Sequence, residues 1–125
     1  MKVVWMRAND EGQTVFEDLD IEAVDTGRGF TTSMIPLVGA IFRTGQPGLD
    51  LDFHNAPRRQ FVVPVGGEIE VEAGDGTIRT IASGEVLLAD DLTGQGHQTR
   101  VVQPAASTLM LAVPDDLDPS QWRRS

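Results

Sequence analysis

The sequence contains no cysteine, so disulfide bridges, thiolate metal sites and a cysteine nucleophile are all excluded. It also lacks any apolar stretch near the roughly 18 residues that a membrane-spanning helix needs. The N-terminal segment "MKVVWMRANDEG" has only a short apolar run, too short for the hydrophobic region of a signal peptide. We therefore expect a cytoplasmic protein that makes no contact with a membrane.

Basic residues are scarce, with 10 lysines and arginines against 19 acidic residues and a formal net charge of −9. An acidic field of this size repels phosphate backbones, and no basic stripe with interleaved aromatic residues is present. We therefore expect no nucleic-acid partner. The acidic residues are expected mostly on the solvated faces of strands and turns. At 125 residues, the chain is expected to form a single domain spanning residues 1–125.

Apolar residues at helical spacing are missing from every long stretch, and short β-rich runs recur instead. Strands are expected at residues 2–6, 14–19, 34–42, 49–54, 60–65, 68–73, 77–81, 85–89, 97–102 and 108–113. Several short strands at this spacing, separated by Gly, Pro and Asp, predict an all-β sandwich or barrel. The tail is expected to hold at most one short helical turn, with Asp118 or Ser120 as its cap and Trp122 pinning it onto the barrel.

The clearest hairpin signal is "EIEVEAGDGTIRTI" at residues 68–81. Ile69, Val71 and Ala73 alternate with glutamates, which predicts one apolar face and one acidic face. The Gly-Asp-Gly that follows supplies positions that tolerate a positive φ, as a tight hairpin turn needs.

The chain has only two histidines, and each lies in an unusual setting. In "LDLDFH", strand alternation places the two aspartates and His54 on one face and the leucines and Phe53 on the other. Taken alone, this pattern is typical of a strand with a core face and a solvated face. His97 follows "TGQG", where Gly94 and Gly96 mark a tight turn. By itself, His97 is more typical of a surface or capping residue than of a ligand.

Together, the two segments resemble the motifs of small single-domain cupins. The first cupin motif is Gly-x5-His-x-His, three or four residues, Glu, six residues and Gly. In "DFHNAPRRQFVVPVGG", His54 stands at the second histidine, Gln60 at the glutamate, and Gly67 closes the motif. The first motif histidine is replaced by Asp52.

The second cupin motif is Gly-x5-Pro-x-Gly-x2-His-x3-Asn. In "GEVLLADDLTGQGHQTRV", Gly84 opens the motif and Gly94-x2-His97 closes it, with an insertion between them. The resemblance covers roughly residues 40–113. It is similar in particular to an uncharacterised subgroup reading "HxAPRRQF…GxGH". It implies a jelly-roll barrel, a double-stranded β-helix of the RmlC-like type.

The resemblance also implies a divalent metal ion (Fe, Zn, Ni or Mn) held in the barrel by His54 and His97, with Asp52 and Gln60 as further ligands. Two imidazoles and one carboxylate with open positions suit Fe(II), and also Mn or Zn. If only the two imidazoles and a neutral amide bind, the metal affinity should be weak and the metal absent. The sequence leaves open whether Asp50 or Asp52 is the inner carboxylate.

Arg58 and Asp91 each have two interpretations, one functional and one structural. Arg58 either anchors an anionic substrate through its guanidinium fork or forms a salt bridge with an acidic residue. Asp91 is either a turn-capping carboxylate or a general base. Arg59 is interpreted as structural, and the buried amide of Gln60 must find partners. Residues expected in the core or lining the pocket are Met34, Phe42, Phe61, Leu88, Met110 and Leu111.

The favoured hypothesis is a metal-dependent cupin enzyme acting on a small, anionic molecule, with Arg58 and Asp91 as candidate catalytic residues. The alternative is a non-catalytic module that binds a small ligand or a metal. A third is a barrel in which the histidines are only structural. A barrel does not select among oxygenation, isomerisation and elimination. We also expect a homodimer, because the apolar runs 34–42 and 60–65 offer more hydrophobic surface than the core of one small barrel needs. The N-terminal strand "KVVWM" would otherwise leave an unpaired sheet edge.

Overall fold

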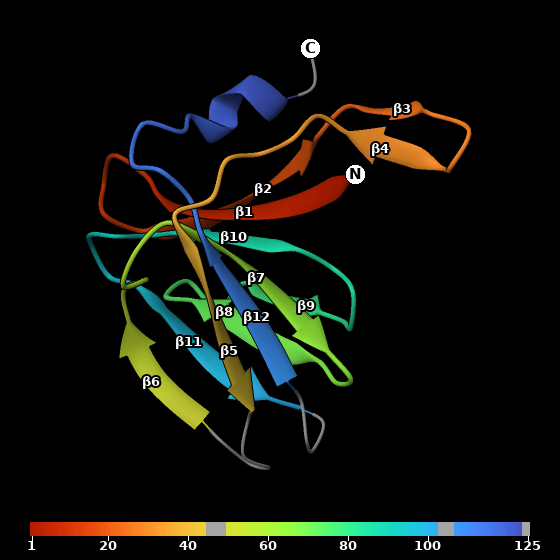
Figure 1. The fold of residues 1–125 in the computed structure, drawn as a ribbon. Coiled ribbons are helices and arrows are strands. Elements are labelled where there is room, and N and C mark those ends of the chain that lie inside the picture. Colours follow the sequence, from red (N-terminus) through yellow and green to blue (C-terminus); the bar gives the residue numbers. More distant parts are fainter. Residues whose placement is uncertain (45–49, 103–106, 124–125) are drawn as a thin grey trace.

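The computed structural model of the chain describes residues 1–44, 50–102 and 107–123. Its elements, drawn in Figure 1, are β1 (Lys2–Ala8), β2 (Thr14–Asp20), β3 (Ala23–Asp25), β4 (Phe30–Thr32), β5 (Gly39–Thr44), β6 (Asp50–His54), β7 (Gln60–Val65), β8 (Ile69–Ala73), β9 (Ile78–Ile81), β10 (Leu87–Asp90), β11 (His97–Val101), β12 (Ser107–Ala112) and the 3-10 helix η1 (Pro119–Trp122). The all-β prediction with one short helical turn in the tail is confirmed. Among the described residues, no helix is long and apolar enough to cross a membrane.

Strands β5 to β12 form the two facing sheets of a jelly roll. One sheet contains the order β10-β7-β12-β5, and the other has the order β6-β11-β8-β9. All neighbours within these two sets are antiparallel. Successive strands alternate between the sheets except at the β8–β9 hairpin, which is the strand order of the jelly roll, the architecture of the cupins. The predicted jelly-roll fold is therefore confirmed. These strands lie within residues 39–112, close to the region of roughly 40–113 that the motif resemblance covers.

The β8–β9 hairpin has the two faces that its sequence predicted. Ile69, Val71 and Ala73 are buried between the sheets. The glutamates between them face outward, where they accept hydrogen bonds from Arg100 of β11 at 3.2 and 2.7 Å. Gly76 in the turn has φ +89°, a value that residues with a side chain rarely adopt.

A second apolar core lies on the outer face of the larger sheet, beneath the C-terminal tail. Phe61 and Leu88 belong to this core, and Trp122 packs against it with its ring centroid 6.2 Å from that of Phe61. The η1 helix is capped by Asp118 Oδ1, which accepts from the Ser120 amide at 3.0 Å. Hydrogen bonds from Ser120 hold the pKa of the Asp118 carboxyl below its usual value. The predicted cap and the predicted contact of Trp122 are both confirmed.

Arg59 ties the same tail to the sheet. Its Nε donates to Asp90 Oδ1 at 2.8 Å, and its Nη1 donates to the carbonyls of Asp115 and Leu117. Asp90 also accepts from Trp5 Nε1 at 2.9 Å. These contacts agree with the structural role expected for Arg59.

The N-terminal strand is not an edge strand. β1 pairs in parallel with β10 and antiparallel with β2, so it extends the larger sheet and is paired on both sides. The expectation that "KVVWM" would be an unpaired edge is therefore wrong. A long-range parallel pairing of this kind leaves no local signal in the sequence.

A short hairpin that the sequence did not reveal follows β2. Strands β3 and β4 form a separate two-stranded sheet that projects from the body of the molecule (Figure 1). The next strand, β5, begins at Gly39 and not at Met34 as predicted. Residues 33–38, which include Pro36, lie outside any strand.

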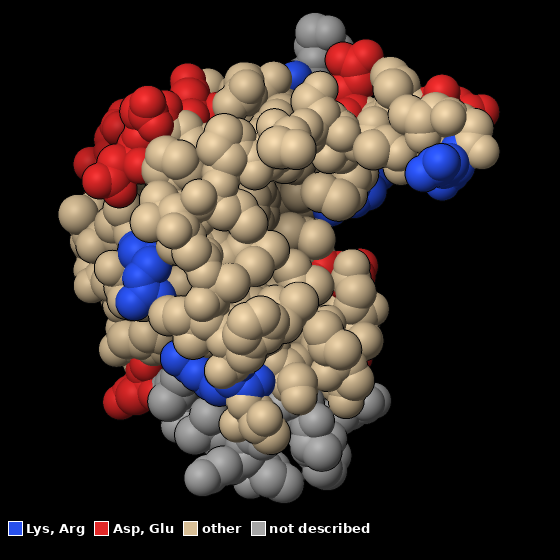
Figure 2. Space-filling view, in the orientation of Figure 1, with Lys and Arg blue, Asp and Glu red and all other residues tan. Residues whose placement is uncertain are grey.

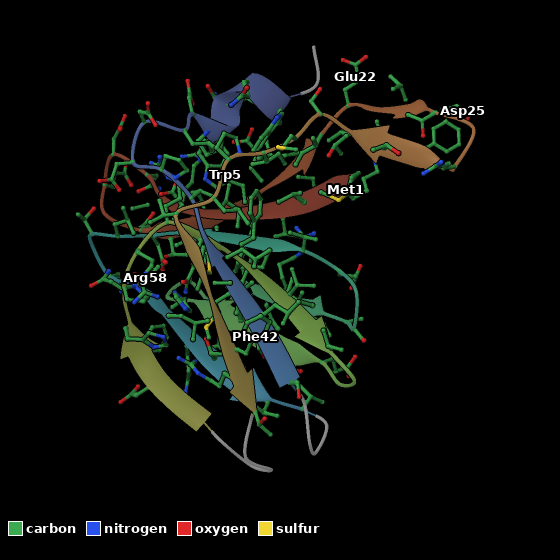
Figure 3. All side chains as sticks on the ribbon, in the orientation of Figure 1. Met1, Trp5, Glu22, Asp25, Phe42 and Arg58 are labelled. Atoms are coloured by element: carbon green, nitrogen blue, oxygen red, sulfur yellow. The ribbon has the colours of Figure 1, made fainter. Side chains whose placement is uncertain are left out.

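Two residues that were expected in the core or the pocket are instead exposed. Met34 is 95% exposed and Phe42 is 76% exposed, so these two predictions are wrong. Phe42 lies on β5, the outermost strand of its sheet (Figure 3). Figure 2 shows that uncharged side chains cover most of the face where β5 and β12 lie. The other four predicted apolar residues lie in the core or against it: Phe61, Leu88, Met110 and Leu111.

Candidate functional site

The two histidines lie side by side at one end of the barrel. His54 ends β6, His97 begins β11, and the two residues are direct partners in the antiparallel register. Their ring centroids are 4.5 Å apart and the ring planes are inclined by 54°. The structure therefore brings together the two residues that the motifs had paired, although 42 residues separate them in the sequence.

Glycines in the turn before β11 make this pairing possible. Gly94 and Gly96 both have φ +80°. A Cβ on Gly96 would collide with the backbone carbonyl of His54, and one on Gly94 would collide with the carbonyl of Gly12. The turn is also tied to the β1–β2 connection, because the Gln95 amide donates to Gly12 O at 2.8 Å. Only residues without a side chain allow the three backbone segments to approach so closely.

Asp91 lies on the Nδ1 side of the His97 ring and fixes the orientation of that ring. The Asp91 side chain is fully buried, and its Oδ2 accepts from His97 Nδ1 at 2.6 Å and from Thr14 Oγ1 at 3.0 Å. Its other oxygen, Oδ1, is buried without a hydrogen-bond partner among the described residues. This geometry is that of a carboxylate that positions a histidine, which differs from both the turn cap and the general base that the sequence suggested for Asp91.

The hydrogen bonds of both rings assign their tautomers. His54 Nδ1 lies 2.7 Å from the backbone oxygen of Asp52. A carbonyl or a carboxylate can only accept, so Nδ1 is the protonated nitrogen in His54 and in His97. Each neutral ring therefore has an unprotonated Nε2 that can take a proton or bind an electrophile.

Gln60 and Arg58 form a second polar pair near the histidines. Gln60 is buried, and its Oε1 accepts from Arg58 Nη1 at 2.9 Å. Figure 3 shows Arg58 near the end of β6. Arg58 thus provides the partner that the buried amide was expected to need.

The side chain of Asp52, unlike its backbone oxygen, is not directed to the histidines. Its side chain is exposed, and its Oδ1 accepts from the Phe53 amide at 2.8 Å. The β6–β11 register shifts between the His97 and Thr99 pairs, so the alternation counted through "LDLDFH" does not hold across this irregularity. Leu49 and the side chain of Asp50, the other candidate for the inner carboxylate, lie outside the described residues.

A cavity of about 310 Å³ between the two sheets has the histidine pair at one end. This volume is at the low end of small-ligand pockets, which occupy about 300–1,000 Å³. His54, Asn55, Gln60 and His97 supply polar groups, and Arg43, which the sequence did not single out, also lines it. The apolar lining consists of Met6, Ala56, Pro57, Val62, Ile69, Val71, Leu87, Ala89, Val101 and Met110. A larger surface hollow, about 680 Å³, lies under the tail and contains neither histidine.

The donor atoms of the side chains that the structure describes do not fit a tightly held metal ion. Catalytic sites for such ions have three protein ligands. In the described part of the chain, no group of three histidine or acidic side chains converges. Gln60 offers a neutral amide whose oxygen already binds Arg58, and Asp91 is behind the His97 ring. The described residues therefore supply two imidazoles and no third strong ligand.

Comparison with known proteins adds little to this geometry. No family model matches the chain, and no curated protein matches it either. Among solved structures, the chain is similar to an RmlC-like cupin protein from Desulfovibrio desulfuricans, with 17% identity and a TM-score of 0.44 over 89% of this chain and 81% of that one. The jelly-roll assignment rests on the strand order of the chain itself, and membership of the "HxAPRRQF…GxGH" subgroup stays a prediction.

Replacing Gly96 by alanine should separate the two histidines and destabilise the fold. Both Gly96→Ala and Gly76→Ala force a side chain into a positive-φ position, at a cost of about 1–2 kcal/mol. A Cβ at Gly76 meets nothing within 4 Å, whereas one at Gly96 collides with His54. Gly96→Ala should therefore lose a further ~1–3 kcal/mol of unfolding free energy. Urea unfolding of the two variants measures the difference, and equal losses would contradict the close approach.

Proposed function

We propose that this barrel is a small-molecule enzyme whose chemistry is proton transfer by His97 and His54. The observation that carries the proposal is the buried Asp91–His97 pair at the end of an apolar-walled cavity. A histidine held by a carboxylate at Nδ1 presents Nε2 as a base of fixed direction. The coarser conclusion, a cupin-type jelly-roll domain, does not depend on this proposal.

Asp91 supports this role in two ways. Its hydrogen bond fixes the His97 tautomer, so that Nε2 and not Nδ1 faces the cavity. When Nε2 takes a proton, the adjacent carboxylate stabilises the imidazolium that forms. The hydroxyl of Thr14 donates to the same carboxylate oxygen and holds it in place.

His54 supplies a second proton-transfer group. Its ring lies beside that of His97, and its Nδ1 is held by the carbonyl of Asp52. One imidazole can remove a proton from a bound molecule while the other returns a proton to a second atom. That sequence is the chemistry of isomerisation and of elimination. The apolar walls exclude water and strengthen the electrostatic effect of the few polar groups.

The metal-centred version of the cupin hypothesis has weaker support, because the described residues lack a third strong ligand. The non-catalytic binding module uses the same cavity and differs only in the absence of turnover. An experiment on proton transfer distinguishes these alternatives without knowledge of the natural substrate.

The test is hydrogen–deuterium exchange into a panel of small carbonyl compounds and carboxylic acids in D₂O, followed by mass spectrometry. We expect the protein to catalyse exchange at a carbon next to the carbonyl of at least one compound. His97→Gln should reduce this rate by about 10²–10⁴-fold, because it removes the base. Asp91→Asn should also reduce it, and added EDTA should leave it unchanged.

Arg79→Gln is the matched control, because Arg79 lies on β9, where it binds Asp18 away from the cavity. Exchange that EDTA abolishes and Fe(II), Zn(II), Ni(II) or Mn(II) restores would favour the metal-centred enzyme. Compounds that bind without exchange would favour the binding module. Equal exchange rates in the wild type and in His97→Gln would contradict the proposed base.

A homodimer stays a prediction, but on a changed basis. β1 is paired within its own chain, so the unpaired-edge reason no longer applies. Met34, Val38 and Phe42 are exposed apolar residues on or just before β5. We expect a mass in solution near twice 13.5 kDa and a single-chain mass in Phe42→Asp. Light scattering of the wild type that gives one chain would contradict it.

A further inference from the structure

We infer that Arg43 binds the acid group of the ligand, so that the ligand class is a small monocarboxylic acid with an apolar body. The inference rests on the proposed function only in that a ligand occupies the cavity beside the histidines. It adds a residue that fixes which ligands the cavity accepts and in which direction they lie.

Arg43 and the histidines mark different levels of the barrel. Arg43 on β5, Thr108 on β12 and Pro64 on β7 are register partners in one row across the sheet. Gln60, which lines the histidine end of the cavity, is in another row with Ala112 and Gly39. Four residues of strand separate these levels, or about 13 Å at the usual rise per residue.

The charge of Arg43 is uncompensated by the described residues. Arg7, Arg59, Arg79, Arg100 and Arg123 each bind a carboxylate. Arg43 forms no ion pair within the described ranges, although the protein as a whole carries a net charge of −9. Among the side chains that the structure describes, no carboxylate lines the cavity and Arg43 is its one guanidinium. A guanidinium placed in this way fits an incoming carboxylate through two parallel hydrogen bonds.

The walls between the two levels are mainly hydrocarbon. Thr99 is the polar residue midway along β11, and its register partner in the same sheet is Val71. Val62 and Met110 line the cavity from the opposite sheet. A ligand that spans this length therefore has one acidic end and an apolar body. A second charge near the middle would be buried without a partner, at high cost.

The test uses straight-chain monocarboxylates from butanoate to octanoate, with the matching primary amides and alcohols as neutral probes. Binding is followed through the imidazole NMR signals of His54 and His97, the only two histidines in the chain. We expect at least one acid to bind the wild type roughly 10-fold more tightly than its amide, as one charge-assisted contact provides. Arg43→Gln should abolish this preference, while Arg79→Gln should keep it.

Arg43 is exposed on an edge strand, so Arg43→Gln should melt near the wild-type temperature, which confirms that the variant is folded. Equal binding of acids and amides to the wild type would overturn the inference. So would an acid preference that survives in Arg43→Gln, or binding of the amides and alcohols alone. In each of these cases the cavity still binds a ligand, and the proposed function stands. If no probe shifts either imidazole signal, the inference fails, and the exchange test above decides the proposed function separately.

Discussion

The close approach of Gly96 to the backbone of His54 decides where both imidazoles lie. With a positive φ and no Cβ, Gly96 lets β11 begin directly beside the end of β6, which makes His97 the register partner of His54. The same turn presses against Gly12 in the β1–β2 connection, and β2 supplies Thr14 to Asp91. Three segments that are distant in sequence thus meet at one end of the barrel. A side chain at Gly94 or Gly96 would collide with the backbone of Gly12 or of His54.

Local signals account for the parts of the fold that the sequence predicts well. The β8–β9 hairpin follows from strict alternation and a glycine turn, and the η1 cap follows from Asp118 two residues before Ser120. No local signal of this kind predicts the exposure of Met34 and Phe42. An apolar residue on an outer strand or in a connection has the same local pattern as one in the core, and only the tertiary arrangement decides what covers it. The β3–β4 hairpin and the parallel β1–β10 pairing are missed for the same reason.

The site likewise contains residues that the sequence predicts and residues that it does not. The order of the two motifs predicted the His54–His97 pair, because glycine turns and strand starts are visible in the sequence. The place of Asp91 behind His97 and of Arg43 in the cavity depends on registers between separate strands, which no local pattern specifies. Asp52 stands at the first histidine of the cupin motif, and strand alternation put it on the face of His54, but the register shift beside His54 makes that count invalid. A fold-level resemblance therefore located the site but not the ligand set within it.

The account depends most directly on the two imidazoles lying together with Nδ1 protonated, and nitrogen-15 NMR of the imidazole groups tests this. The chain has two histidines, so only two sets of ring signals arise. We predict the Nδ1–H tautomer for both neutral rings, a contact between their protons in the nuclear Overhauser spectrum, and a far-downfield Nδ1 proton on His97 that is lost in Asp91→Asn. A His97 ring protonated at Nε2, or two rings with no Overhauser contact, would contradict the account.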